Sequence, residues 1–312
     1  MTVLSGILAA AIASGTVIAF AALGELLAER TGVQNLGLEG VMAMGALAAI
    51  AVNLMIPIPM IGLLAAMAMG CILGIVFATA TVTLRANQVL CGLGLAFLGT
   101  GLSGRLGASI SGFRAPAPFE SIRIPILADI PVIGNALFDQ PWLVYVAYFI
   151  LPALISYMLM KTRHGMNVRA VGENPAAADA CGVSVNRVRF LYTVIGCVLA
   201  AIGGAYITLG FTPSWIEGIT AGRGWIAIAL VIFGAWRPLP VVLGALLFGA
   251  VTSLGFVAQI QGWGIPASFL AMLPYLGTIL LMVIPIVARA RREKRLGTGP
   301  AALGIPYVRE GE

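Results

Sequence analysis

Apolar stretches long enough to cross a lipid bilayer recur along this sequence, and they restrict the fold more than any other feature. A helix that crosses the hydrocarbon core needs about 20 consecutive, mostly apolar residues. Nine stretches approach this requirement: 3–24, 36–56, 60–84, 88–110, 142–160, 190–211, 225–236, 239–257 and 267–288. We therefore predict an all-α, polytopic membrane protein with about nine transmembrane helices, in a range of eight to ten, some of them broken.

The composition agrees with a membrane protein. Charged residues make up only 10% of the chain and hydrophobic residues 60%, whereas soluble domains carry about 25% charged residues. The formal net charge is +6, but the basic residues cluster beside apolar stretches, as cytoplasmic loops require. The charge therefore indicates membrane orientation, and we expect the chain to bind a lipid bilayer and no nucleic acid.

Neither the cysteines nor the histidine have a spacing that indicates catalysis or metal binding. Cys71, Cys91, Cys181 and Cys197 lack the paired spacing of metal ligands, and we expect four free thiols. His164 is the single histidine, which argues against a histidine-based metal site or catalytic pair. The nucleotide-binding pattern G-x-x-x-x-G-K-[ST] does not occur. We predict no catalytic residue, no metal site and no cofactor in this chain, and no enzyme activity.

A polar stretch, residues 161–189, separates two apolar runs and contains the signals of a short helix. Asn174 is a typical N-cap, and Pro175 suits the first helical position because its missing N–H is not needed there. Gly182 suits the left-handed residue that follows a helix. A helix of about two turns is unstable alone in water. It is either a capped surface helix or a helix held by another protein.

Polar residues at three places in the apolar stretches have two interpretations each. Glu39 follows Asn35 by four residues, so that both would lie on one helix face. Glu39 is then either a functional group in the membrane or a charge that stabilises the start of its own helix. Asn87 and Gln88 either face a polar pathway or cap a helix, and we prefer the cap.

The stretch 225–236 is about 18 Å long as a helix, against a hydrocarbon core of about 30 Å. It is therefore either a half-helix or includes residues 220–224. In the second case Arg223 lies inside the membrane as a pathway or gate residue, paired with Glu217, or it extends to the headgroups. Trp215 and Trp225 either offer a flat face to a solute or anchor the chain at the membrane interface.

Loop positions and charges set the expected orientation. The loops 161–189 and 289–295 are strongly basic, which places both in the cytoplasm. Counting spans outward places the N-terminus and the five-proline loop 111–141 outside, and the C-terminus inside. We predict a transmembrane domain over 1–288 and a basic cytoplasmic tail over 289–312 that is disordered.

Four stretches together resemble one family. GELLAERTGVQNLGLEGVMAMGA, ANQVLCGLGLAFLGTGLSG, GENPAAADACG and GRGWIAIALVIFGAWRPL occur in this order, over most of residues 20–285. They are similar to the permeases of bacterial nucleoside and simple-sugar ABC importers, which are related to ribose and branched-chain amino-acid permeases. NLGLEG and GRGW look most like the permeases that work with lipoprotein-type nucleoside receptors.

The resemblance implies partners, a membrane and a role for the 161–189 loop. It implies a partner ATPase that binds ATP and Mg²⁺, a second permease chain (a related paralogue or another copy), an external substrate-binding protein, and the bacterial inner membrane. The loop 161–189 would then couple to the ATPase through Gly172, Glu173, Asn174, Pro175, Ala177, Ala178 and Gly182. The candidate translocation pathway comprises Asn35, Glu39, Asn87, Gln88, Arg223 and Trp225.

The polar groups of the spans favour a neutral solute, because an isolated ion in a low dielectric is very costly. Glu39 and Arg223 have opposite charges, and amides and hydroxyls make up the rest. We predict nucleoside transport by alternating access, driven by the partner ATPase. The alternatives are a ribose-like sugar permease and an ion-coupled secondary transporter, although the spans contain no aspartate for such coupling.

Overall fold

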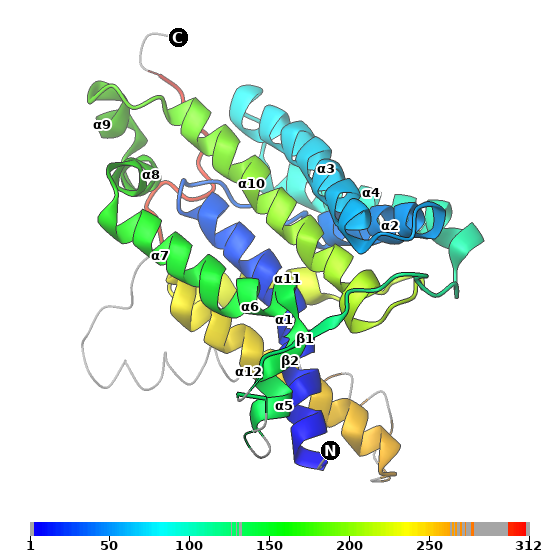
Figure 1. Ribbon diagram of the computed structural model, residues 1–312. Coiled ribbons are helices and arrows are strands. Elements are labelled where there is room, and N and C mark those ends of the chain that lie inside the picture. Colours follow the sequence, from blue (N-terminus) through cyan, green and yellow to red (C-terminus); the bar gives the residue numbers. More distant parts are fainter. Residues whose placement is uncertain are drawn as a thin grey trace.

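In the computed structural model, helices dominate the part of the chain that is described: residues 3–125, 127–128, 130, 133–262, 264, 266, 269, 272, 276–277 and 299–309. Figure 1 shows long helices packed side by side. The helices that make up the apolar bundle are α1 (Val3–Glu29), α2 (Leu38–Met55), α3 (Pro59–Ala78), α4 (Gln88–Gly107), α7 (Leu151–Lys161), α10 (Val185–Tyr206) and α12 (Pro238–Ile260). Three π-helical segments continue or precede them: η1 (Thr79–Thr83), η3 (Val146–Ile150) and η4 (Ile207–Phe211).

Within the described residues, seven helical segments are long and apolar enough to span a membrane: Ser5–Glu29, Leu38–Met55, Pro59–Thr83, Gln88–Ile110, Trp142–Lys161, Val185–Phe211 and Pro238–Gln259. The prediction of an all-α, polytopic membrane protein is confirmed. An eighth apolar helix, α11 (Arg223–Phe233), is shorter. The predicted span 267–288 lies outside the described residues apart from a few positions, so the predicted count of nine is approximate.

Helices α1 and α10 form the centre of the bundle (Figure 1). In their spans 67% of the most apolar window is buried, similar to the 72% of the neighbouring α2 span and well above the 28% of the α4 span. The two helices meet at glycines: a Cβ added to Gly24 would lie 2.5 Å from the Gly196 carbonyl oxygen. Small residues allow such close approach where lipid provides no hydrophobic driving force. The sequence's many glycines therefore serve packing at this crossing.

The first helix is longer than the sequence indicated. We placed its end at Gly24, but α1 continues to Glu29, and both Glu25 and Glu29 are completely buried. Gly24 does not break the helix because it is a packing position against α10. The chain then leaves the helix over residues 30–37, and α2 begins only at Leu38. Asn35 and Glu39 therefore do not share a helix face, which corrects that prediction.

The predicted external loop 111–141 bonds to residues 209–215 in its first part and contains a small two-stranded unit in its second part. Strands β1 (Ser121–Arg123) and β2 (Asp139–Pro141) pair in antiparallel fashion, with α5 (Ile133–Phe138) between them. The short η2 (Ala108–Ile110) precedes the loop and α6 (Trp142–Tyr145) follows it. The Tyr145 hydroxyl donates to the Ile122 carbonyl at 3.2 Å. Figure 1 shows this unit near the N-terminal end of α1, at the opposite end of the bundle from the 161–189 loop.

We expected disorder in the tail over 289–312; its residues 299–309, which we call the C-terminal strap, are hydrogen-bonded to the bundle. The Ala302 amide donates to the Gly172 carbonyl at 2.9 Å, and the Gly304 amide donates to the Gly32 carbonyl at 3.1 Å. Ala302 is buried. The strap is ordered because it supplies these backbone hydrogen bonds and apolar side chains to the bundle. Its terminal position predicted disorder, but its own composition is largely small and apolar.

Labelling of single cysteines tests the orientation. Ser111, in the loop predicted to lie outside, and Ala176, in the loop predicted to lie in the cytoplasm, are both exposed. In a background without the four native cysteines, we expect Ser111→Cys to react with an impermeant maleimide added outside cells. Ala176→Cys should react only after the membrane is opened, because the 161–189 loop is basic. Labelling of both positions from the same side would contradict the orientation.

Candidate functional site

The short helix in the 161–189 loop forms as its sequence predicts. Helix α8 (Arg163–Glu173) leads to α9 (Pro175–Ala180). The Asn174 side chain accepts a hydrogen bond from the Ala177 amide at 3.0 Å, and Pro175 occupies the first turn. Gly182 has φ +83°, the left-handed conformation expected after a helix. The local structure is therefore fixed by its capping residues.

The alanines of α9 divide into an exposed and a buried set. Ala176, Ala177 and Ala180 are exposed. Ala178 is only 4% exposed, because it packs in a small apolar cluster with Val171 and Val185. The exposed alanines form a surface of small side chains, and Ala178 supports it from below. We had placed Ala177 and Ala178 together on a contact surface, and only Ala177 faces outward.

The C-terminal strap holds α8 and α9 against the bundle. Gly172 is buried at the end of α8, where an added Cβ would clash with the Arg30 carbonyl oxygen. Glu173, which is exposed, accepts a hydrogen bond from the Ala301 amide at 3.4 Å. Arg309 and Asp179 form an ion pair at 2.9 Å. The strap thereby joins the end of α8, the surface helix α9 and the loop after α1.

Helix α11 is a half-helix that begins at Arg223, two residues before the predicted start at 225, and so lies between the two alternatives that the sequence left open. It has 11 residues, about 16 Å at 1.5 Å per residue. Its N-terminus is capped by Glu39 from α2, whose two carboxylate oxygens accept from the amides of Gly222 at 2.8 Å and Gly224 at 2.7 Å. Glu39 is 7% exposed. A carboxylate at this position stabilises the partial positive charge of the helix N-terminus.

Arg223 and Trp225 lie in the first turn of α11. The Arg223 side chain donates to the carbonyl of Ile219 at 2.9 Å, and its guanidinium carbon lies 5.6 Å from the centre of the Phe211 ring. The side chain of Trp225 is 37% exposed. Glu39 and these two residues are thus brought together at the start of the half-helix.

Asn35 and Gln88, two residues of the candidate pathway with amide side chains, stabilise the non-helical segment between α1 and α2. The Asn35 side chain accepts from the Gly37 amide at 2.8 Å, and the Gln88 side chain accepts from the Gln34 amide at 2.8 Å. Asn87 accepts from the Leu90 amide at 3.0 Å and is the N-cap of α4, which confirms that interpretation. Asn35 and Gln88 are buried. These amides form a second group, separate in role from Glu39 and α11.

Sequence reasoning missed the buried carboxyl groups of α1. The Glu25 carboxyl group accepts a hydrogen bond from the backbone N–H of Asn35 at 2.7 Å, and the Glu29 carboxyl group accepts one from the indole N–H of Trp236. Arg30 donates to the Trp236 carbonyl at 2.6 and 2.9 Å. The four-residue spacing of Glu25 and Glu29 beside an apolar run was the available signal, because an ionisable residue within a span is a functional candidate.

Outside the membrane-spanning segments, Arg30 lies among several charged groups that change its pKa. Burial is the largest cause that lowers the pKa of Arg30. The negative charge of Glu173 raises its pKa, whereas the positive charges of Arg169 and Arg237 lower it. Among the described residues there is no group of three or more histidine, cysteine, aspartate or glutamate side chains that could hold a metal ion. The site therefore consists of capped helix ends and hydrogen-bonded breaks.

A polytopic bundle with a half-helix inside it and a short exposed helix on one end has the architecture of a membrane permease. The model of the branched-chain amino acid transport system / permease component family matches residues 7–288. The chain belongs to this family and is a transport-system permease. No solved structure matches it.

Three relatives illustrate the range of proteins to which the chain is similar. It is 33% identical to the guanosine ABC transporter permease protein NupQ of Bacillus subtilis, over 98% of both chains. It is 34% identical to the nucleoside ABC transporter permease protein NupC of Lactococcus lactis, over 94% of both chains. It is 39% identical to the putative glucose ABC transporter permease protein TsgC13 of Haloferax volcanii, over 83% of this chain and 79% of that protein. The resemblance to nucleoside and simple-sugar permeases is confirmed.

Proposed function

We propose that this chain is the permease subunit of an ABC importer in a bacterial inner membrane, and that it translocates nucleosides. The observation that carries the proposal is α9, a capped helix that exposes Ala176 and Ala177 in a chain of this family. A convex surface of small side chains suits insertion into a groove on a partner ATPase. The chain lacks its own P-loop pattern, so the partner supplies ATP hydrolysis.

The connections of α9 provide a route for the coupling movement. Helix α10 begins at Val185, close after α9, and packs against α1, α2 and α3. The strap links α9 to the loop after α1 through Asp179, Gly172 and Gly32. A displacement of α9 by the ATPase therefore acts on the central helix α10 and on the α1–α2 break together. In this mechanism the movement opens the pathway alternately to either side.

The start of α11 is the proposed centre of the pathway. Half-helices in transporters place their polar ends near the middle of the membrane, where the substrate passes. Here Glu39 neutralises the N-terminus of α11 through the Gly222 and Gly224 amides. The neutralised helix end favours a neutral, hydrogen-bonding solute, and the partly exposed Trp225 offers an aromatic face. Asn35 and Gln88 act as positioning residues, because their side chains already bond to the backbone.

Competition for uptake tests the substrate class. In cells that express the complete importer, we expect purine and pyrimidine nucleosides to compete with one another, and free ribose or glucose to compete poorly. Nucleoside-permease relatives that cover nearly the whole chain support this choice. Strong competition by a free sugar, with none by nucleosides, would place the chain on the sugar branch, which the Haloferax relative also represents. Uptake that persists without ATP would favour a secondary transporter.

A further inference from the structure

A cavity of about 570 Å³ lies where α7 ends and α12 begins. Its polar lining includes three arginines from different segments: Arg30 after α1, Arg169 in α8, and Arg237 before α12. Leu159, Met160 and Leu239 contribute the main apolar lining. The cavity therefore has both a basic and an apolar lining.

Two of the three arginines, Arg30 and Arg169, are partly buried and Arg237 is exposed, and one buried donor lacks an acceptor within the part of the chain that is described. The Arg169 Nε atom is buried without a hydrogen-bond partner there. Arg30 uses its donors on the Trp236 carbonyl, and the positive charges of Arg169 and Arg237 both act on it. The neighbouring carboxyl groups are Glu173, which acts on Arg30, and Glu29, which is bonded to the indole of the lining residue Trp236, so three guanidinium groups face two carboxyl groups. An unpaired buried donor is costly, so the cluster fits an added anion.

The surroundings of the cavity match a membrane surface. Met160 is 66% exposed and Leu239 is 63% exposed, at the mouth of the cavity. Leu154 on α7 and Leu243 on α12 continue this exposed apolar surface along the same two helices. The basic 161–189 loop places this end of the bundle in the cytoplasm. Basic pockets between transmembrane helices on that side bind the headgroups of anionic lipids.

We propose that this cavity binds an anionic phospholipid, with its phosphate between Arg169 and Arg237 and its acyl chains along α7 and α12. Guanidinium groups are suited to phosphate because they donate parallel hydrogen bonds. The apolar mouth distinguishes a lipid from a free anion, which would gain nothing from Met160 and Leu239. The bound headgroup stabilises the turn from Trp236 to Pro238 that joins the half-helix α11 to α12.

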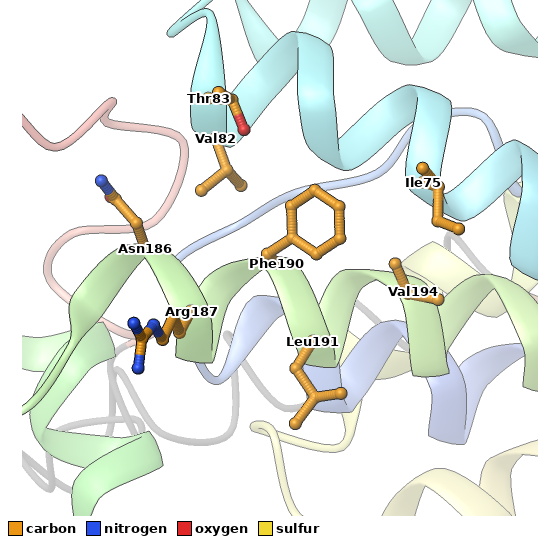
Figure 2. A pocket seen from close by; sticks show the side chains of 8 residues that line it. All are labelled: Ile75, Val82, Thr83, Asn186, Arg187, Phe190, Leu191 and Val194. Carbon is orange, nitrogen blue, oxygen red and sulfur yellow. The ribbon is translucent and has the colours of Figure 1, made fainter.

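A second cavity provides a matched control. It measures about 480 Å³ and lies between α3, η1 and α10. Figure 2 shows its apolar side chains, Phe190 among them, together with Asn186 and Arg187. It has one guanidinium in place of three, so its attraction for a phosphate is weaker. Arg187→Gln removes the same charge as Arg237→Gln at another cavity.

Lipid binding to the full-length chain in dodecylmaltoside tests the proposal. Native mass spectrometry would compare dioleoylphosphatidylglycerol with dioleoylphosphatidylcholine. We expect Arg169→Gln with Arg237→Gln to weaken phosphatidylglycerol binding roughly 25-fold, because each arginine near a membrane surface contributes about fivefold. Arg187→Gln should change it by less than about twofold, and Arg169→Lys with Arg237→Lys should retain most of it.

Three results would overturn the proposal. One is equal binding of both lipids to the unaltered chain, and another is unchanged phosphatidylglycerol binding by the double glutamine variant. The third is displacement of the lipid by millimolar inorganic phosphate, which would assign the arginines to a free anion. If the double glutamine variant does not fold, Arg237→Gln alone decides, because Arg237 is exposed and its loss should still weaken binding about fivefold.

Discussion

Replacement of Ala177 by arginine is expected to abolish uptake while the permease remains inserted and folded. Ala177 is exposed on α9, and arginine is nearly as good a helix former as alanine. A long charged side chain on a surface of alanines cannot enter a groove that fits small residues. A loss of about 3 kcal/mol in contact energy would weaken docking more than 100-fold. ATP-driven uptake and co-purification with the ATPase measure the effect.

Two further variants control this experiment. Ala177→Ser adds one oxygen atom to the same surface, and we expect nearly normal uptake. Ala178→Arg introduces a charge at a position that is 4% exposed, where an unpaired charge is costly. It should lower the melting temperature of the permease itself, whereas Ala177→Arg should not. Normal uptake by Ala177→Arg would refute the docking role of α9.

Replacement of Glu39 by leucine is expected to destabilise the start of the half-helix and eliminate uptake. The change leaves the amides of Gly222 and Gly224 without their acceptors. An unsatisfied buried donor costs about 1–3 kcal/mol, so we expect about that loss from the buried Gly224 and a smaller one from the partly buried Gly222. Hydrogen exchange should become faster at the amides of residues 222–226, and the melting temperature should fall.

Glu39→Gln is the matched control, because it keeps the side-chain length and one carbonyl oxygen. It should retain one of the two hydrogen bonds but lose the charge that faces the helix N-terminus. We expect roughly half of the destabilisation caused by leucine and a partial loss of uptake. If exchange at residues 222–226 is unchanged in the leucine variant, Glu39 does not hold α11 in place.

Features encoded by neighbouring residues were predictable from the sequence. The cap at Asn174, the proline at position 175 and the left-handed Gly182 specify α9 through local contacts alone. The shortness of α11 followed from the length of its apolar run. In both cases the decisive residues lie within a few positions of one another, so that no knowledge of the packed structure was needed.

Features that depend on distant partners were not predictable. The bond from Gly222 to Glu39 joins residues 183 positions apart, and the bond from Trp236 to Glu29 joins residues 207 positions apart. From the sequence, one interpretation was that Glu39 stabilises the start of its own helix, α2. In the structure its carboxylate accepts hydrogen bonds at the start of α11. Glu25 and Glu29 seemed to follow the first span, because only the packing of α10 against Gly24 shows that the helix continues.

The C-terminal strap also sets an order for assembly. Residues 299–309 are synthesised after every helix that the structure describes, yet they bond to Gly32 and Gly172 from much earlier parts of the chain. The carbonyl groups of Gly32 and Gly172 therefore lack these hydrogen bonds while the helices insert into the membrane. During translation α9 emerges without its strap contacts, including the ion pair between Asp179 and Arg309. The strap contacts that hold α8 and α9 therefore form only after the helices have inserted. An ATPase that bound α9 before then would bind a helix without these contacts.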